Sequence, residues 1–343
     1  MSDSYIQLSG SFKSIRKLPL NLKKEDEAIF QHEVIHDCIP GYLLELEDIF
    51  YTGYGSVVVS VTRSLPKEFI FYNSIKVHSF LSFLFFICNK RLKSRYKIIR
   101  EPVIFIADIR SNNYFHWIGE VLPRLLEAKE KIGKYSVILP TKFRDLNFVS
   151  DSLNYIGLSF RFMEKFSLYK LKHIFFVSHF SVTGNYNDEI IKRTGKALQS
   201  VGKADERNQR IYISRSKADR RKIINEAELT KILIEHNFKI IYCEELSFSG
   251  QASIFSDARI LISIHGAGLT NMIFMSPGAA VLELRYQNDR HSNCYFSLAS
   301  ALDINYYYQQ CPPVNPESDP YRSDLIVDAE IFKALLLQIC NSK

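Results

Sequence analysis

Two patterns that would indicate a metal site or a disulfide framework are missing from this chain of 343 residues. No Asp-x-Asp triplet occurs, although that triplet is a common means of holding a divalent ion against a diphosphate group. The six cysteines are scattered and form no C-x-x-C pair, which argues against structural disulfides and a zinc site. We therefore expect reduced thiols, no metal and no tightly bound cofactor.

Targeting and membrane-spanning segments are missing as well. The first seven residues have no basic stretch followed by an apolar one, so we expect no secretory signal peptide and a cytoplasmic location. The longest apolar run, residues 80–88, is far shorter than the ~20 residues of a membrane-spanning helix. A basic segment follows, so residues 80–97 could lie peripherally on the inner membrane leaflet or form an amphipathic helix packed on the protein itself. The sequence leaves both alternatives open.

The composition is that of an ordinary folded chain. Hydrophobic residues make up 46%, and the length allows two domains with substantial cores. The formal net charge of +7 favours an anionic partner without identifying it. Because no RNA- or DNA-binding motif is present, we do not expect nucleic acid to be that partner.

A turn of small residues is the most informative segment. Residues 260–264 predict a buried parallel strand, and residues 269–275 predict the start of a helix. Between them, Gly266 and Gly268 can adopt positive φ and let a ligand approach the backbone, while the helix offers unpaired N–H groups. This pattern favours a nucleotide diphosphate, although an isolated turn of this kind is often only a tight connection.

Polar side chains also mark the ends of two neighbouring predicted strands. Glu283 lies near the end of strand 280–284, where an acid commonly binds ribose hydroxyls. The loop after strand 210–214 carries a group of basic residues that includes Arg215, Lys217, Arg220 and Arg221. Because open α/β sheets bind ligands at this edge, we interpret the loop as a phosphate site rather than as a solvated surface.

His116 and Glu120 lie four residues apart on a predicted helix, 114–131, that follows a predicted strand, 103–107. This spacing puts them on one face, where they can touch. An imidazole oriented by a carboxylate can accept a proton near neutral pH. Alternatively, the pair is only a histidine at a helix start beside an acid that the helix dipole favours.

Taken together, these segments resemble glycosyltransferase family 61, the DUF563-type transferases. That family carries N-x-x-H-W, an acid four positions after the histidine, and a following L-P-R, as residues 113–124 do here. Its C-terminal half carries S-R, R-x-I-x-N-E, a glutamine at a helix start, H-G-A-G-L-T-N, and P-G before an acidic strand end. The similarity runs from about residue 103 to about residue 310.

The resemblance implies an inverting, metal-independent glycosyltransferase of GT-B type, with two Rossmann-like domains facing a cleft. By this resemblance His116 and Glu120 are catalytic. We favour His116 as the base and keep Glu120 as the alternative base. The residues expected to bind the nucleotide-sugar donor are Asn113, Arg215, Arg220, Arg221, Glu226, Gln251, His265, Gly266, Ala267, Gly268, Asn271 and Glu283.

The change in periodicity along the chain predicts two α/β domains. We expect a domain on the acceptor side over residues 1–205, made of a β-rich segment at 1–75 and a Rossmann-like unit at 100–180. A polar segment, 196–209, leads into a second Rossmann-like domain at 206–343 that binds the donor.

The function expected from these features is transfer of a sugar from a nucleotide sugar to a hydroxyl of a glycan or lipid-linked glycan acceptor. By the resemblance, the product is a bacterial capsule, lipopolysaccharide or related surface polysaccharide. The alternatives are a catalytically inactive GT-B-like protein that binds a nucleotide or glycan, and another GT-B enzyme such as a sugar-nucleotide epimerase. The sequence identifies neither the donor sugar, the acceptor and linkage, nor the oligomeric state.

Overall fold

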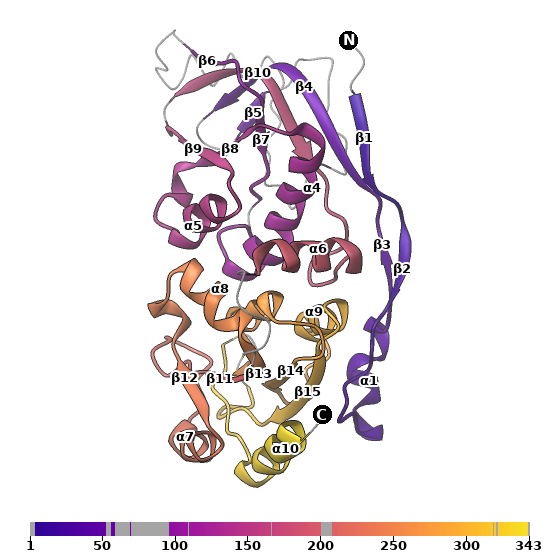
Figure 1. Cartoon of the computed structure of the whole chain (residues 1–343), viewed down its shortest axis with the longest axis vertical. Helices are drawn as coiled ribbons and strands as arrows, with labels where there is room; N and C mark the ends of the chain where they lie inside the picture. Colours follow the sequence, from indigo (N-terminus) through magenta and orange to yellow (C-terminus); the bar gives the residue numbers. More distant parts are fainter. Residues whose placement is uncertain are drawn as a thin grey trace. The chain divides into compact units, whose positions relative to one another are not determined.

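The fold is given by a computed structural model that describes residues 4–52, 56–58, 69, 96–108, 110–165, 167–199, 208–317, 319 and 322–341. The chain has a mixed α/β structure and divides into two compact units (Figure 1). The first unit comprises residues 1–12 and 38–182, and the second comprises residues 13–37 and 183–343.

The first unit is built on a mixed sheet with the strand order β1-β4-β10-β7-β8-β9. β10, β7, β8 and β9 run parallel to one another, whereas β4 is antiparallel to both β10 and β1. β5 adds to β4 and β6 adds to β10. The strands are β1 (Ser4–Ser9), β4 (Gly41–Thr52), β5 (Ser56–Val58), β6 (Lys97–Ile99), β7 (Val103–Phe105), β8 (Ser136–Pro140), β9 (Ser159–Met163) and β10 (Leu168–Val177).

The parallel part of this sheet has the strand order of half a Rossmann fold. In chain order β7, β8, β9 and β10 are the first to fourth strands, so the spatial sequence reads 3-2-1-4. The intervening helices are α3 (Tyr114–His116), the π-helical turn η4 (Trp117–Val121), α4 (Leu122–Ile132), η5 (Thr141–Phe143) and α5 (Asn147–Tyr155). The alternation predicted from residue 103 onward is therefore confirmed. β9 was not predicted because exposed and partly exposed residues alternate along it, so it has no buried apolar run.

The second unit contains a five-stranded sheet in which every neighbouring pair is parallel. Its strand order is β12-β11-β13-β14-β15, which reads 2-1-3-4-5 in chain order and is typical of doubly wound folds. The strands are β11 (Gln209–Ile213), β12 (Phe238–Ile241), β13 (Ala258–Ile264), β14 (Ala280–Tyr286) and β15 (Asn305–Cys311).

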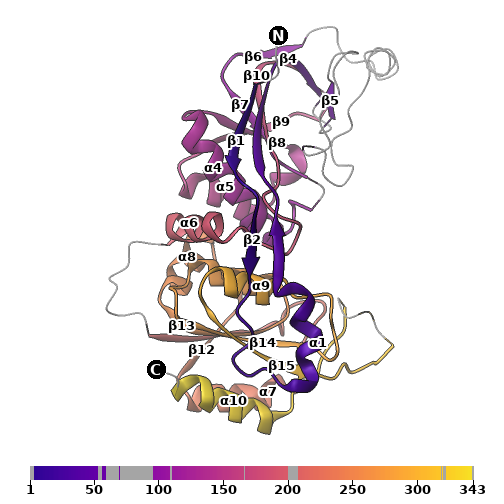
Figure 2. The ribbon, with the colours of Figure 1, turned by 90° about the vertical axis from the view of Figure 1, so that its right-hand side faces the viewer.

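Helices cover both faces of this sheet. In Figure 2, α8 (Phe248–Ser256) and α9 (Cys294–Ala301) lie on one face, and α7 (Glu226–Glu235) and α10 (Ala329–Asn341) lie on the other. The short helices are η7 (Cys243–Glu245) and η8 (Ala267–Phe274). We predicted the start of a helix at 269–275, and residues 267–274 form a helix of the 3-10 type, which is packed by α6 (Asp188–Leu198), α8 and α9. This buried setting offsets the poorer hydrogen-bond geometry of a 3-10 helix.

An N-terminal segment also belongs to the second unit. It contains β2 (Phe12–Ile15), η1 (Lys24–Asp26), α1 (Glu27–Phe30), η2 (Gln31–Glu33) and β3 (Ile35–Cys38), and β2 pairs with β3. The Phe30 ring packs against Phe296, Tyr306 and Tyr308, and Tyr308 donates a hydrogen bond to Asp26. These contacts explain why residues 13–37 group with the C-terminal half.

The boundary between the units falls at 182/183, earlier than the 205/206 boundary expected from the sequence. The physical reason is α6, which begins at the side-chain cap of Asn187 and packs on η8 and α9. Gly195 of this helix lies so close to the backbone of Ile273 that a Cβ would approach its carbonyl oxygen to 2.9 Å. Residues 200–207 of the predicted polar segment lie outside the described residues.

In the described part of residues 1–75, for which we predicted a β-rich segment, the structure has β1 to β5. Most of the segment 80–97, to which we assigned either a membrane contact or an amphipathic helix, lies outside the described residues. Among the described residues, no helix is both long enough and apolar enough to cross a membrane.

Candidate functional site

A cavity lies at the carboxyl edge of the parallel sheet in the second unit. β11 and β13 are neighbours, but the chain continues from β11 to β12 on one side and from β13 to β14 on the other. Parallel α/β sheets bind ligands at such a switch point, because the connections diverge there and leave a crevice. The cavity has a volume of about 360 Å³, and its lining includes Ser214, Arg215, Cys243, Ser263 and Gly268. This volume lies within the usual range for small-molecule sites.

Arg215 and Arg220 line this cavity, and together with the adjacent Arg221 they are here called the arginine cluster. The Arg215 guanidinium donates to the carbonyl oxygens of Arg221 (3.3 Å) and Arg220 (3.2 Å), and Arg221 donates to the carbonyl of His265 (3.4 Å). In the described part of the chain, none of the three forms a salt bridge with a carboxylate. Burial lowers the pKa of Arg215 and of Arg221, and the positive charge of a neighbouring arginine lowers each further. An anion would relieve this repulsion.

The backbone of Arg221 is held in an unusual conformation. Its φ is 57°, and the other non-glycine residues with positive φ in the described part of the chain are all Asp or Asn, which tolerate this region better. A residue held in the left-handed region costs about 1–3 kcal/mol and is often found at a functional site. In this conformation the Arg221 carbonyl accepts a hydrogen bond that orients Arg215, and the Arg221 side chain reaches the carbonyl of His265.

The two glycines of the turn act differently from our expectation. Gly266 has an extended backbone with φ 171°, and Gly268 is not among the described glycines with positive φ. What matters is the missing Cβ. At Gly266 a Cβ would lie 3.3 Å from the Arg215 guanidinium, and at Gly268 it would lie 3.2 Å from the Ile213 side chain. The turn is therefore glycine-rich because neighbouring side chains pack against its backbone.

His265 and Glu283 form a hydrogen-bonded pair next to the turn. Nδ1 of His265 lies 2.5 Å from the Glu283 carboxylate, whose other oxygen accepts a hydrogen bond from Tyr306. Glu283 is fully buried. Burial alone would raise the pKa of this carboxyl group, but His265, Arg285 and the Tyr306 hydroxyl lower it overall. Because both of its oxygens are engaged, Glu283 is placed to hold His265 and not, as the sequence suggested, to bind a ribose.

The remaining predicted donor-side residues have local structural partners. Glu226 accepts a hydrogen bond from the Tyr212 hydroxyl at 2.7 Å. Gln251 on α8 accepts one from the Asn271 side chain at 2.9 Å and donates to the carbonyls of Cys243 and Leu246. Ala267 is the first residue of η8. Donor contact by these residues stays a prediction.

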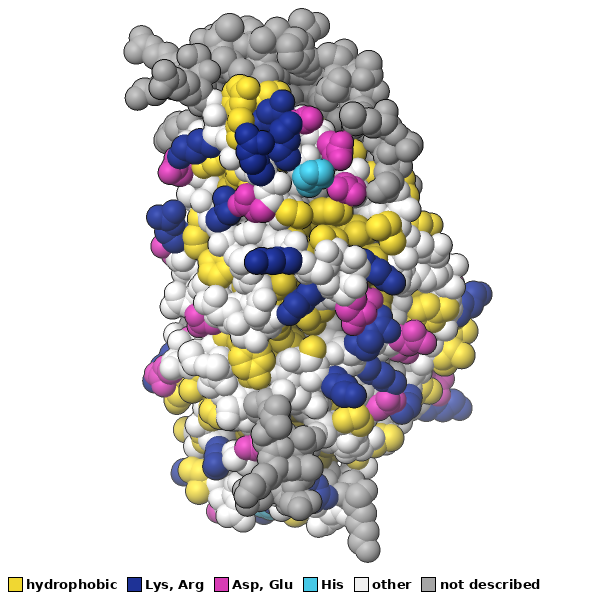
Figure 3. Space-filling model, turned by 45° about the horizontal axis from the view of Figure 1, so that its top comes forward, with side chains coloured by type: hydrophobic (Ala, Val, Ile, Leu, Met, Phe, Trp, Pro, Cys, Tyr) yellow, Lys and Arg dark blue, Asp and Glu magenta, His cyan; other side chains and the backbone are white. Residues whose placement is uncertain are grey.

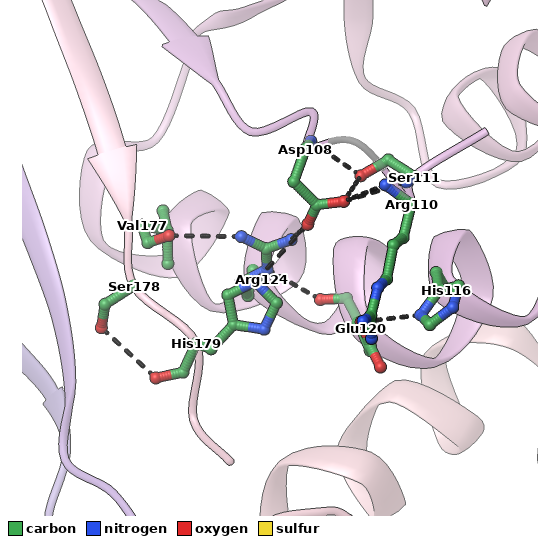
Figure 4. Close-up of polar contacts among 9 residues, drawn as sticks. All are labelled: Asp108, Arg110, Ser111, His116, Glu120, Arg124, Val177, Ser178 and His179. Atoms are coloured by element: carbon green, nitrogen blue, oxygen red, sulfur yellow. Dashed lines mark hydrogen bonds and ion pairs between the residues drawn. The ribbon is translucent and has the colours of Figure 1, made fainter. Parts of the chain in front are cut away.

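In the first unit, His116 and Glu120 touch as expected. His116 Nδ1 lies 3.1 Å from Glu120 Oε2, and the side chains are 17% and 7% exposed (Figure 4). Glu120 lies in the π-helical turn 117–121, and such turns often occur at functional sites. Its second oxygen, Oε1, is buried and has no hydrogen-bond partner among the described residues. The Arg110 side chain extends toward this pair (Figure 4).

Asp108, Arg124 and His179 form a buried network beside this pair. Asp108 follows β7 and His179 follows β10, so both lie at the carboxyl ends of the two strands at which the strand order reverses. Arg124 donates from Nε to the Glu120 carbonyl (2.9 Å) and from Nη2 to Asp108 (3.4 Å), and His179 Nε2 lies 3.5 Å from Asp108. Burial opposes ionisation of Asp108, but hydrogen bonds from His179 and Ser111 and the charge of Arg124 lower its pKa overall.

The other motif residues of this helix are structural. The Asn113 side chain caps α3 by accepting a hydrogen bond from the Phe115 N–H at 2.9 Å. Trp117 is fully buried and donates to Ser152, so its ring does not form a sugar-binding surface. Donor contact by Asn113, which lies in the first unit, stays a prediction.

The sequence did not identify Asp108, His179 or Tyr306, and it gave Arg124 no role. Asp108 and His179 directly follow predicted strand ends, which is the signal that could have revealed them. Tyr306 lies within β15, where an aromatic residue is ordinary, so nothing marked it.

One possible metal-binding group exists among the described residues. Glu45 and Glu47 on β4 and His173 on β10 place their ligand atoms within 4.8 Å of one another, but all three are partly exposed. None of the five described cysteines forms a disulfide, and Cys88 lies outside the described residues. On the face shown in Figure 3, the basic and acidic side chains that are drawn in colour are interspersed.

Comparison with known proteins agrees with the geometry. The family model of Glycosyltransferase 61 matches residues 114–282, a stretch that begins at α3 and ends within β14. It thus includes the His116–Glu120 pair and the arginine cluster. This region is similar to glycosyltransferase family 61.

Curated relatives are also glycosyltransferases. The EGF domain-specific O-linked N-acetylglucosamine transferase of Gallus gallus is 35% identical over 107 residues, which are 28% of this chain and 19% of that protein. The transferase of the same name from Drosophila melanogaster is 32% identical over 132 residues, 37% of this chain and 25% of the relative. The protein O-linked-mannose beta-1,4-N-acetylglucosaminyltransferase 2 of Takifugu rubripes is 31% identical over 138 residues, which are 38% of this chain and 23% of that protein.

The match spans about a fifth to a quarter of these relatives' own length. The family and these relatives are all glycosyltransferases by name.

Proposed function

We propose that this protein transfers a sugar from a nucleotide-sugar donor to a hydroxyl group of a glycan acceptor. The observation that carries this proposal is the arginine cluster. In the described part of the chain its three guanidinium groups lack carboxylate partners, and they lie beside a cavity at the switch point of a parallel sheet. Guanidinium groups match the geometry of phosphate oxygens, so the site suits the diphosphate of a nucleotide sugar.

The proposed reaction does not use a metal to stabilise the leaving nucleoside diphosphate. Arg215 and Arg221 supply positive charge in its place. Positive charge placed in advance, where negative charge develops, is an effective way to lower a barrier.

The proposed base is His116. Since its Nδ1 faces Glu120, Nε2 is the nitrogen available to take the proton of the acceptor hydroxyl. Glu120 is a poorer candidate for direct proton abstraction, because one oxygen contacts His116 and the other is buried. A single displacement with this base would invert the configuration at the anomeric carbon.

The proposal includes a GT-B arrangement in which the first unit serves the acceptor and the second binds the donor. The 3-2-1-4 and 2-1-3-4-5 strand orders are what such an arrangement requires of each unit. From the relatives' names we propose N-acetylglucosamine as the first sugar to test. Synthesis of a bacterial surface polysaccharide, from a glycan or lipid-linked glycan acceptor in the cytoplasm, is part of the same proposal.

Calorimetric titration of the purified protein with UDP, GDP, CDP and CMP tests donor binding. We expect one of these nucleotides to bind, and Arg215→Gln to weaken binding at least about tenfold, the loss expected for one charge-assisted contact. Arg259→Gln is the matched control, because Arg259 lies at the amino end of β13 and should leave binding unchanged. Failure of all four nucleotides to bind would refute the proposed donor site.

A second measurement separates an enzyme from an inactive binding protein. Release of the nucleotide from its sugar conjugate, for example from UDP-N-acetylglucosamine, is followed in the presence of glycan acceptors. Turnover that is lost in His116→Ala supports the transferase. Tight nucleotide binding without turnover of any donor would favour the binding protein.

A further inference from the structure

His265 and Glu283 form a second histidine–carboxylate pair, and the proposed function gives this pair no role. Glu283 is fully buried, and its oxygens contact His265 and Tyr306. A buried carboxylate is stable as an anion only when positive charge lies close to it. Arg285 supplies part of that charge, but its own hydrogen bonds run to Tyr306, Asp289 and Asn293 and not to Glu283. Of the two groups hydrogen-bonded to this carboxylate, His265 and Tyr306, His265 is the one that can become a cation.

The orientation of the ring determines which nitrogen can meet a ligand. Because Nδ1 faces Glu283, Nε2 is the nitrogen left open, and the side chain remains 16% exposed. The ring lies against Tyr295 with a centroid separation of 4.9 Å, which fixes its plane. Among the described residues, Nε2 has no hydrogen-bond partner.

His265 is also joined to the arginine cluster. Its carbonyl accepts a hydrogen bond from Arg221, and the next residue, Gly266, lies against the Arg215 side chain. These arginines repel a positive charge on the imidazole, whereas Glu283 attracts it. A diphosphate bound to the cluster would neutralise the arginine charge and add acceptor oxygens, so it would shift the balance toward the protonated ring.

We propose that His265 is a proton-linked ligand of the diphosphate: it takes up a proton when the nucleotide binds and then donates a hydrogen bond from Nε2 to a phosphate oxygen. This inference rests on the proposed donor site and assigns a specific role within it. The protonated imidazole acts as a fixed cation where other transferases use a metal ion. The charged and titratable groups around His265 are Glu283 and Arg285 on β14, Tyr306 on β15, Tyr295 on α9, Arg221 before α7, and Asp289 after β14.

The test is isothermal titration of the native protein with UDP and GDP at pH 8 in two buffers of different ionisation enthalpy. We expect uptake of a substantial fraction of one proton for each nucleotide bound. His265→Gln retains a side-chain donor but cannot titrate, so it should bind with little or no proton uptake and with affinity reduced about tenfold, as expected for one hydrogen bond to a charged group. His236→Gln, at the end of α7, is the matched control and should behave like the native protein.

The outcomes distinguish this inference from the donor-site proposal. Binding without proton uptake in the native protein, or unchanged uptake in His265→Gln, would overturn the role of His265 while leaving the arginine site intact. If neither UDP nor GDP binds, the titration is repeated with CDP and CMP, and failure of all four nucleotides means that the donor site and this inference both fail. Should His265→Gln not fold, the ¹⁵N shifts of the His265 imidazole in the native protein decide, because UDP binding must move both nitrogens toward the values of a protonated ring.

Discussion

Arg124 donates its Nε–H to the backbone carbonyl of Glu120 at 2.9 Å, so a buried arginine anchors the π-helical turn that carries the acid beside His116. The same guanidinium contacts Asp108 and the Val177 carbonyl. It thus ties the turn to the ends of β7 and β10, the strands at which the sheet order reverses. This relationship indicates that the position of Glu120 depends on residues that do not themselves face a ligand.

Arg124→Lys should lower kcat about tenfold to a hundredfold and leave nucleotide affinity nearly unchanged. Lysine retains the positive charge next to Asp108 but loses the planar fork that reaches three partners at once. Displacement of a catalytic group by about 1 Å can have an effect of this size. Steady-state kinetics and calorimetry of the variant check it, with Arg144→Lys on the exposed side of the same unit as control. A variant with native kcat would show that the turn holds without this anchor.

His116→Ala should reduce kcat by a factor of about 10² to 10⁴, the usual contribution of a positioned base, with little change in donor affinity. Stability should stay close to native, because the side chain is partly exposed and its described hydrogen bond is the one to Glu120. Nearly full turnover in this variant would exclude His116 as the base and leave Glu120. If Glu120→Gln were active too, this helix would have no part in catalysis.

Gly268→Val should abolish nucleotide binding. A Cβ at this position would approach two atoms of the Ile213 side chain to 3.2 and 3.3 Å, so the added branch must displace either that side chain or the turn that borders the cavity. Calorimetry with the nucleotide that binds the native protein measures the loss. Gly10→Val is the control, since a Cβ there meets nothing within 4 Å. If Gly268→Val bound the nucleotide with native affinity, the turn would not be part of the binding site.

Turnover should be insensitive to EDTA. This expectation rests on the missing Asp-x-Asp triplet and on the arginine cluster, whose charge replaces that of an ion. The assay compares initial rates with and without chelator, followed by addition of manganese or magnesium. Activity lost in EDTA and restored by either ion would contradict the prediction and would make Glu45, Glu47 and His173 the first residues to substitute.

Acid should lower the folding stability of the first unit by protonating Asp108. Burial raises the pKa of this carboxyl group, but its hydrogen bonds and Arg124 lower it below the ordinary value of 3.8. A lowered folded-state pKa gives stability that is fully present above the unfolded pKa and is lost as the pH falls through the folded one. Asp108→Asn should therefore destabilise the protein by about 3–5 kcal/mol near neutral pH, the cost of breaking a buried pair, and by less below about pH 4. Urea unfolding at pH 7 and at about pH 2, well below the unfolded pKa, checks this, and an equal loss at both would refute it.

The strands and helices that position both sites could be predicted because their sequence patterns are local. Residues 260–264 are apolar except for Ser263 and became a fully buried strand, and the four-residue spacing of His116 and Glu120 was enough to bring their side chains together. The loop arginines could be placed at a strand end for the same reason.

What could not be predicted depends on partners distant in sequence. Whether Glu283 faces a ligand or the core is determined by Tyr306, which is 23 residues away on the next strand. The crowding that a Cβ at Gly266 would meet comes from the Arg215 side chain, and the boundary at 182/183 follows from the contacts of α6 with η8. No local pattern encodes such relationships.

The contacts of residues 13–37 have a consequence for how the chain folds during synthesis. Asp26 meets Tyr308, which lies 282 residues later, and every strand between them in the second sheet is parallel, so none of its strand pairs can form as a local hairpin. The N-terminal segment therefore leaves the ribosome long before its binding surface exists. While the first unit folds, this segment must remain without its partners in the second sheet. The second unit can complete its fold only after β15 has been translated.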